Sequence, residues 1–194
     1  LTISSGAGVD SITGGTGADY INGGGGHDVI VGGTGADTIF GGAGNDTITG
    51  GAGGDMLYGG TGCDTFYFSG NGVVSLDTIE DFVSGTGNDQ IQIGNAAGFA
   101  WGNEAAGFHY SSDGLSNNYA LIVLNESSSF DSAASASGLA DQLFVNNGVN
   151  DADGGAYIFI WQDSSSVVHI SYGESVTGAD SYKDVVKLVG VSLS

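Results

Sequence analysis

A nine-residue period runs through the first third of the chain. From Ser5 to Tyr67, seven consecutive units read SGAGVDSIT, GGTGADYIN, GGGGHDVIV, GGTGADTIF, GGAGNDTIT, GGAGGDMLY and GGTGCDTFY. Aspartate occupies the sixth place of every unit, and the eighth place is always a large apolar residue. A period held this strictly predicts a repeat architecture, in which each unit packs mainly on its neighbours.

Each unit divides into a turn and a short strand. Glycines at the first, second and fourth places permit positive φ and a close approach of neighbouring backbones. The last three residues favour β structure, and only the middle one is reliably apolar, so its side chain should face inward. Two units then make one coil, and stacked coils make a parallel β-roll. We therefore expect an all-β fold in which seven nonapeptide repeats form a roll, capped by a β-rich C-terminal half.

The charge of the chain limits the partners that it can bind. Its formal net charge is -20, and its only basic residues apart from histidine are Lys183 and Lys187. The carboxylates of the repeats therefore have no Lys or Arg nearby in the sequence, and must be solvated, cap backbone groups or bind metal. Such a surface excludes nucleic acid and anionic membranes as partners and favours divalent cations.

The repeat spacing places these carboxylates in columns. Units eighteen residues apart lie on the same edge of a roll, which aligns Asp19 with Asp37 and Asp55. An unneutralised column repels itself, whereas a cation with six to eight oxygen ligands would bridge it, and the glycine turns offer carbonyls. Calcium suits such a site better than magnesium, which prefers strict octahedra. Seven units give five complete pairs, and five Ca²⁺ ions would offset ten of the twenty negative charges.

The units resemble the RTX (repeats-in-toxin) nonapeptide G-G-x-G-x-D-x-U-x, a calcium-binding β-roll repeat. The resemblance implies that an earlier turn supplies its second and fourth carbonyls and its aspartate. The turn eighteen residues later supplies its first and third carbonyls and its own aspartate, so that Gly15, Gly17 and Asp19 would face Gly32, Thr34 and Asp37. The candidate metal-ligating residues in the seven units are Gly6, Gly8, Asp10, Gly15, Gly17, Asp19, Gly23, Gly24, Gly25, Gly26, Asp28, Gly32, Gly33, Thr34, Gly35, Asp37, Gly41, Gly42, Ala43, Gly44, Asp46, Gly50, Gly51, Ala52, Gly53, Asp55, Gly59, Gly60, Thr61, Gly62 and Asp64.

The segment after the repeats, SLDTIEDFVSGTGNDQIQIG over residues 75–94, resembles the post-repeat segment of the same family. The resemblance implies that Asp77, Asp81 and Asp89 complete the last calcium turns, and Asp77 and Asp81 join the candidate ligands. Ile79, Phe82, Ile91 and Ile93 should close the open end of the stack, which would otherwise expose strand edges. We expect the roll to span residues 1–72, the capping segment 73–94 and a β-rich domain 95–194.

The C-terminal half should be an antiparallel sheet that packs on the roll or continues it. Six segments are typical of strands: FHYSS, NYALIVLN, DQLFVNN, AYIFIWQ, VVHISYG and DVVKLVG. The stretch AYIFIWQDSSSVVHISYG predicts a hairpin, and a short helix is expected over residues 132–143. NDADGG, residues 150–155, is a plain turn or a further calcium loop, and the turn is favoured because the full loop spacing is absent.

We expect no catalytic site in this chain. It contains no HExxH, CxxC or GxSxG sequence and no arginine, and His27, His109 and His169 occupy a variable turn position and alternating strands. The final residues, SYKDVVKLVGVSLS, resemble the uncleaved tails that address RTX proteins to type I secretion, although a final core strand is an equal reading. The chain starts without a signal peptide or membrane span, so we expect a piece of a longer protein, secreted or at the bacterial cell surface.

Three functions remain open at this point. The chain is a calcium-switched folding and export module, a surface-layer or adhesin segment that binds other copies or surface glycans, or the C-terminal domain of a secreted hydrolase. The outward face of the even-numbered units carries Tyr20, Phe40, Met56 and Tyr58. We expect this face to be covered, by residues after Asn95 or by a neighbouring molecule.

Overall fold

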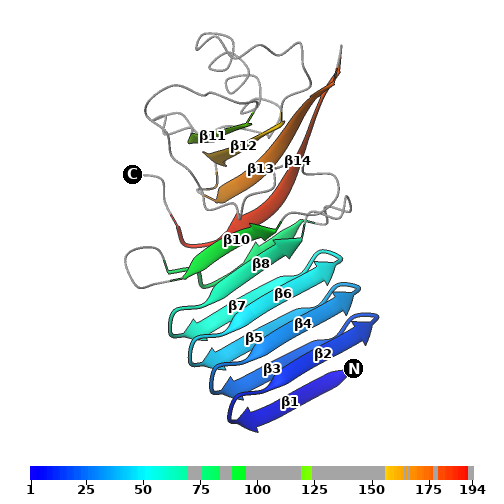
Figure 1. The fold of residues 1–194 in the computed structure, drawn as a ribbon, viewed down its shortest axis with the longest axis vertical. Helices are drawn as coiled ribbons and strands as arrows, with labels where there is room; N and C mark the ends of the chain where they lie inside the picture. The colour runs from blue at the N-terminus through cyan, green and yellow to red at the C-terminus, as the bar shows by residue number, and fades with distance from the viewer. Residues whose placement is uncertain are drawn as a thin grey trace.

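The computed structural model describes residues 1–69, 76–83, 89–94, 119–123, 156–163, 165, 167–176 and 179–191. These residues form two sheets and the turns between them, and no helix occurs among them (Figure 1). The all-β prediction is therefore confirmed. None of the described segments is a helix long and apolar enough to cross a membrane.

The repeats wind between the two sheets as predicted. One sheet begins with β1 (Thr2–Ala7), β3 (Tyr20–Gly25), β5 (Thr38–Ala43) and β7 (Met56–Thr61), and the other contains β2 (Ser11–Thr16), β4 (Val29–Thr34), β6 (Thr47–Ala52) and β8 (Thr65–Ser69). Neighbouring strands pair in parallel with partners eighteen residues apart, as Ile21 with Ile39 and Ile30 with Ile48. Two units therefore make one coil of a parallel β-roll.

The strands are longer than the sequence pattern predicts, because each continues through the first three residues of the next unit. Positive φ occurs at the second and fourth glycines, as at Gly33 and Gly35, but not at the first. At the first place space is the constraint. A Cβ on Gly32 would lie 2.5 Å from Asp37 Oδ2 and 2.5 Å from the Gly50 carbonyl oxygen.

The eighth-place side chains form the predicted core of the roll. Those from the second to the seventh unit are fully buried, and Ile12 of the first unit is 7% exposed. They form one continuous apolar cluster with residues from beyond the repeats. Each strand of the repeats contributes a single eighth-place side chain to this core. The apolar core is therefore small, and most of the residues of each unit lie outside it.

The segment after the repeats adds strands to the stack. β9 (Asp77–Ile79) pairs in parallel with β7, and β10 (Gln90–Gly94) pairs in parallel with β8. Ile79 is fully buried, and Phe82 and Ile91 pack against the core while partly buried. Ile93 lies in β10.

The C-terminal strands continue the first sheet in the order β9-β14-β13-β12-β11 (Figure 1). The strands are β11 (Tyr119–Val123), β12 (Ala156–Gln162), β13 (Val168–Val176) and β14 (Ala179–Leu188). The predicted hairpin β12–β13 is confirmed, and β13–β14 is a second antiparallel pair. The expectation of a wholly antiparallel sheet is wrong, because β11 runs parallel to β12 and β14 runs parallel to β9. FHYSS, DQLFVNN, the helix expected over 132–143 and the turn at 150–155 lie outside the described residues.

The outward face of the even-numbered units carries an aromatic column. Phe40 stacks on Tyr58 with ring centroids 4.4 Å apart and an angle of 8° between the rings, and Tyr20 lies 5.4 Å from Phe40. Phe40 and Tyr58 are half-buried, whereas Tyr20 is 47% and Met56 43% exposed. Within the chain this face is therefore covered only in part, and the predicted cover by a neighbouring molecule stays a prediction.

Candidate metal centre

The sixth-place aspartates lie in the turns along both edges of the roll. Because two units make one coil, one edge carries the aspartates of odd-numbered units and the other those of even-numbered units. Asp19, Asp28, Asp37, Asp46, Asp55 and Asp64 are all buried, with at most 4% of each residue exposed. Buried carboxylates must be hydrogen-bonded or paired with a cation, since an unpaired buried charge is costly.

In five of the seven repeat aspartates, one carboxylate oxygen accepts a hydrogen bond from the backbone of the turn eighteen residues earlier. Asp37 Oδ1 accepts a hydrogen bond from the Asp19 backbone N–H at 2.8 Å, which joins turns eighteen residues apart. The same bond recurs in all five pairs that the repeats form: Asp10–Asp28, Asp19–Asp37, Asp28–Asp46, Asp37–Asp55 and Asp46–Asp64. The bonds fix the side chains in position and leave the other oxygen of each carboxylate to be accounted for.

That second oxygen has no protein partner. Oδ2 of the aspartate in every one of the seven units is buried without a hydrogen bond. Native proteins leave few buried polar atoms unsatisfied, and such atoms call for an explanation such as a bound ion. Seven in register, all on carboxylates, fit a column of hard cations, and the residues present therefore match the chemistry of calcium.

Backbone carbonyls converge on the same spaces. A Cβ built on Gly32 would lie 2.5 Å from both Asp37 Oδ2 and the Gly50 carbonyl oxygen, so these two oxygens lie close to each other on one side of the turn. The carbonyls of the second and fourth glycines of each turn point at the matching glycines of the turn eighteen residues later, on the same edge of the roll. The Gly15 carbonyl faces Gly33, and the Gly17 carbonyl faces Gly35. The structure thus brings together the two turns of each predicted site.

The third-place carbonyls are partly engaged already. The Thr34 carbonyl accepts a hydrogen bond from the Gly17 N–H at 2.7 Å, and Ala43, Ala52 and Thr61 accept in the same way. A carbonyl oxygen has two lone pairs, so these atoms retain one for an ion.

Electrostatics opposes ionisation of this column when no cation is bound. Burial raises the pKa of Asp55 and of Asp64 to about 6, and that of Asp77 to about 8. Burial likewise raises the pKa of Asp37 and Asp46, although the backbone hydrogen bond from the preceding aspartate partly offsets it. A neighbouring aspartate raises each pKa further. A cation at Oδ2 would stabilise the ionised form of these carboxyls, which burial and the neighbouring aspartates otherwise disfavour.

Two aspartates after the repeats extend the pattern. Asp77 Oδ1 accepts from the Asp55 N–H and Asp89 Oδ1 accepts from the Asp64 N–H, both at 2.9 Å. Asp89, which the family resemblance assigns to the last calcium turns, also carries the repeat signal in the sequence. Residues 84–92 read SGTGNDQIQ, which is the nonapeptide pattern with serine at the first place, as in the first unit.

Asp81, in contrast, lies outside the chain of paired aspartates. Its Oδ1 accepts from the Gly59 N–H and its Oδ2 from the Gly60 N–H, both at 2.9 Å. β9 ends at Ile79, two residues before Asp81, and the carboxylate takes the first backbone donors of the seventh unit. Both oxygens of Asp81 therefore have protein partners, and its role as a calcium ligand stays a prediction.

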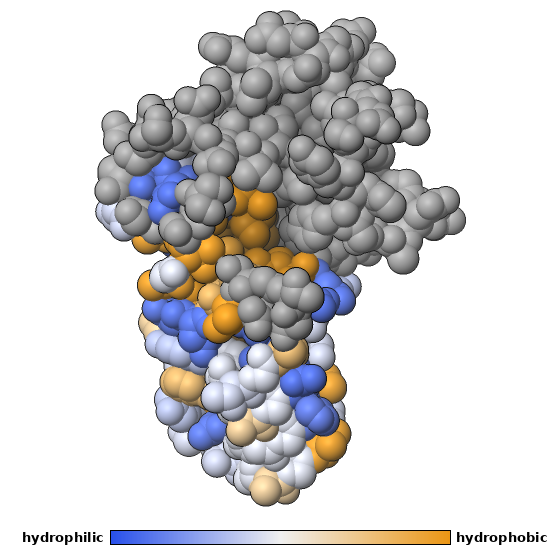
Figure 2. All heavy atoms as spheres, turned by 90° about the vertical axis from the view of Figure 1, so that its left-hand side faces the viewer, coloured by the Kyte–Doolittle hydropathy of each residue, from blue (hydrophilic) through white to orange (hydrophobic). Residues whose placement is uncertain are grey.

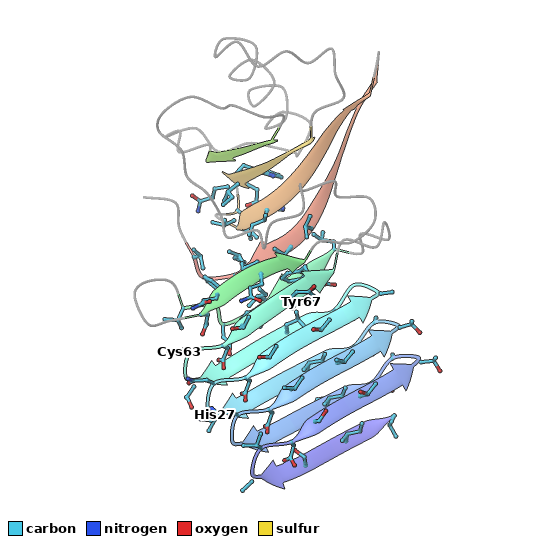
Figure 3. The ribbon with its side chains drawn as sticks, in the orientation of Figure 1. His27, Cys63 and Tyr67 are labelled. Atoms are coloured by element: carbon cyan, nitrogen blue, oxygen red, sulfur yellow. The ribbon has the colours of Figure 1, made fainter. Side chains whose placement is uncertain are left out.

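The remaining candidate side chains have structural contacts. His27 Nδ1 accepts from the Asn45 N–H at 2.7 Å, and Asn45 Oδ1 accepts from the Cys63 N–H at 3.0 Å, along one edge of the roll (Figure 3). His169 Nε2 lies 3.2 Å from Asp163 Oδ2, and His109 falls outside the described residues. The described residues contain no group of three or more His, Cys, Asp or Glu side chains that could hold a metal. Ions in the roll therefore need backbone carbonyls as well as paired aspartates.

Comparison with known proteins agrees with this geometry. The family model described as "RTX calcium-binding nonapeptide repeat (4 copies)" matches residues 4–39 and 31–66. A solved structure, the AlgE6R3 subunit from the Azotobacter vinelandii mannuronan C5-epimerase, matches with 24% identity over 97% of this chain and 74% of that chain. Its TM-score is 0.32, which supports no argument about function. No curated protein matches the chain. Residues 4–66 are therefore RTX calcium-binding nonapeptide repeats, folded as a β-roll.

Proposed function

We propose that the chain is a calcium-switched folding and export module at the C-terminal end of a longer extracellular protein. The observation that carries the proposal is the set of seven buried aspartate Oδ2 atoms without a partner. A chain with these carboxylates ionised lacks the interactions to hold its turns together. Calcium between the turns supplies them.

The proposal explains where the module folds. Extracellular calcium modules load at roughly 10⁻⁴ to 10⁻³ M, well above the free calcium inside a cell. The acidic chain would stay unfolded inside the cell and pass through the type I secretion machinery, which reads the C-terminal tail. Outside, calcium binding would contribute the folding free energy, because the sites do not exist in the unfolded chain.

Each ion would sit between two turns of the same edge. Five sites join pairs of repeats, with the ligands predicted from the family resemblance. The bonds from the Asp55 and Asp64 N–H groups to Asp77 and Asp89 support two more, although Asp89 Oδ2 also accepts from the Val83 N–H at 2.8 Å. Asp81 is then a capping residue, since it accepts from the Gly59 and Gly60 N–H groups and not from the N–H of a repeat aspartate. The chain's own residues would perform no catalytic step.

The same module would serve as a surface-assembly segment of a surface-layer protein or adhesin. Tyr20 and Met56 leave apolar surface exposed on the outward face of the roll, beside the stacked Phe40 and Tyr58. Apolar patches of this kind suit contact with other copies or with surface glycans. Charge repulsion would oppose that contact until calcium lowers the negative charge of the chain.

Circular dichroism (CD) with calcium and with chelator tests the switch. We expect a disordered spectrum in chelator and a β-rich spectrum at millimolar Ca²⁺, while Mg²⁺ at the same concentration should not substitute. A β-rich spectrum that is unchanged by complete removal of calcium would refute the proposal.

A further inference from the structure

Strand β9 joins the roll to the C-terminal strands. It is three residues long, and it pairs with β7 on one side and with β14 on the other. On the roll side Met56 pairs with Thr78 and Leu57 with Ile79, and on the other side Lys187 pairs with Thr78. Among the described residues, the sheet passes from the roll to the C-terminal half through this strand.

A candidate calcium ligand begins that strand. Asp77 is 4% exposed, and its Oδ1 accepts from the Asp55 N–H in the same pattern as the repeat aspartates. Asp77 is also the register partner of Val186 in β14. One residue thus belongs both to a column of paired carboxylates and to the ladder of the C-terminal sheet.

The apolar core also crosses this junction. Ile79 and Val186 are fully buried, and Leu188 is 5% exposed, in the same cluster as the isoleucines of the roll. Figure 2 shows apolar surface gathered between the roll and the part of the chain that follows it. Displacement of β9 would therefore expose apolar side chains of both parts to water, which is unfavourable.

We infer that calcium at the Asp55–Asp77 pair controls whether the C-terminal sheet docks on the roll. Without the ion, two buried carboxylates on adjacent strands repel, and a three-residue strand has few backbone bonds with which to resist. β14 then loses its parallel partner, and Val186 and Leu188 lose their cover. With the ion bound, Asp77 holds β9 in register against β7, and β14 can pair with it. This inference rests on the proposed function, because it requires that the roll binds calcium.

Trp161 offers a reporter within the C-terminal sheet. It is 2% exposed, its Nε1 donates to Ser171 Oγ at 2.8 Å, and its ring stacks on His169 at 4.1 Å. It lies in β12, two strands from β14. Trp101 is the only other tryptophan in the sequence, so a Trp101→Phe chain isolates the emission of Trp161.

The test is a calcium titration of the Trp101→Phe chain with two probes, far-UV CD for the roll and Trp161 emission for the C-terminal sheet. We expect Trp161 to emit as an exposed indole in chelator and to shift to the blue as calcium rises. If CD depends on calcium while Trp161 emission is the same in chelator and in calcium, this inference is overturned and the proposed function stands. If CD itself ignores calcium, the proposed function fails.

A matched pair of variants tests whether docking depends on the calcium site at Asp77 in particular. Asp77→Asn keeps an acceptor for the Asp55 N–H but removes the charge, and it should raise the calcium midpoint of the Trp161 signal by ~10-fold or more. Asp10→Asn makes the same change at the far end of the roll and should shift that midpoint less than 2-fold. Equal shifts in the two variants would overturn the inference. If Asp77→Asn does not fold, the calcium titration of the Trp101→Phe chain without that substitution still tests the inference.

Discussion

Asp37→Asn removes one charge from the middle of the roll while keeping most of its geometry. Asp37 Oδ1 accepts from the Asp19 N–H at 2.8 Å, and an asparagine oxygen can do the same. The new amide replaces the unpartnered Oδ2, and the Gly50 carbonyl faces the same space. Because Asp37 pairs with both Asp19 and Asp55, the substitution should weaken two sites, whereas Asp10→Asn should weaken one.

The expected magnitude follows from binding linkage. For sites with Kd of roughly 10⁻⁴ to 10⁻³ M, 10 mM calcium is a ~10- to 100-fold excess, worth about 1.4 to 2.7 kcal/mol per site. Asp37→Asn should therefore lose about 3 to 5 kcal/mol of unfolding free energy in calcium, and Asp10→Asn about half of that. At 1 mM calcium both losses should be smaller, because that concentration is only ~1- to 10-fold above the Kd and each site then adds about 0.4 to 1.4 kcal/mol.

Urea unfolding followed by CD at 10 mM and at 1 mM calcium measures both values, and calorimetric titration counts the ions lost. An equal destabilisation of Asp37→Asn at the two calcium concentrations would refute the reasoning. It would show that the aspartate acts through packing or hydrogen bonding and not through an ion.

Three further changes probe the same sites. Because burial raises the pKa of Asp77 from 3.8 to about 8, the calcium-free roll binds more protons than the unfolded chain, so its stability should fall as pH rises through this range. In chelator, the CD spectrum should therefore show more β structure at pH 5 than at pH 7.5, and the opposite order contradicts this. Gly32→Ala places a methyl group 2.5 Å from two oxygens and should cost about 1–3 kcal/mol, while the third-place Thr34→Ala should change stability by less than about 0.5 kcal/mol. Asp81→Ala should lower the free energy of unfolding in urea by about 1–3 kcal/mol without changing the number of bound ions. Loss of a bound ion in this variant would instead indicate that Asp81 is a calcium ligand.

The period of the repeat was enough to predict the roll. Aspartate at the sixth place and an apolar residue at the eighth fix which side chains face the edge and the core, because a strand alternates its faces. The role of the first glycine could not be read from the pattern. It has ordinary φ, and only the stacked coils reveal that a Cβ on Gly32 would meet Asp37 and the Gly50 carbonyl.

Beyond the repeats, local sequence carried less information. The alternating apolar pattern located β12, β13 and the hairpin between them, but not that β11 pairs in parallel with β12. Strand direction depends on connections distant in the chain, which a local pattern does not contain. Asp77 and Asp81 both belong to the expected post-repeat motif, yet only Asp77 takes the repeat hydrogen bond, because β9 parts from β7 before Asp81.

The most direct test of calcium between the turns is diffraction from crystals grown in millimolar Ca²⁺, with anomalous scattering to identify the ions. We expect one calcium peak within about 2.3–2.6 Å of each aspartate Oδ2 of the repeats. Ordered turns with water or nothing at these oxygens would contradict the account.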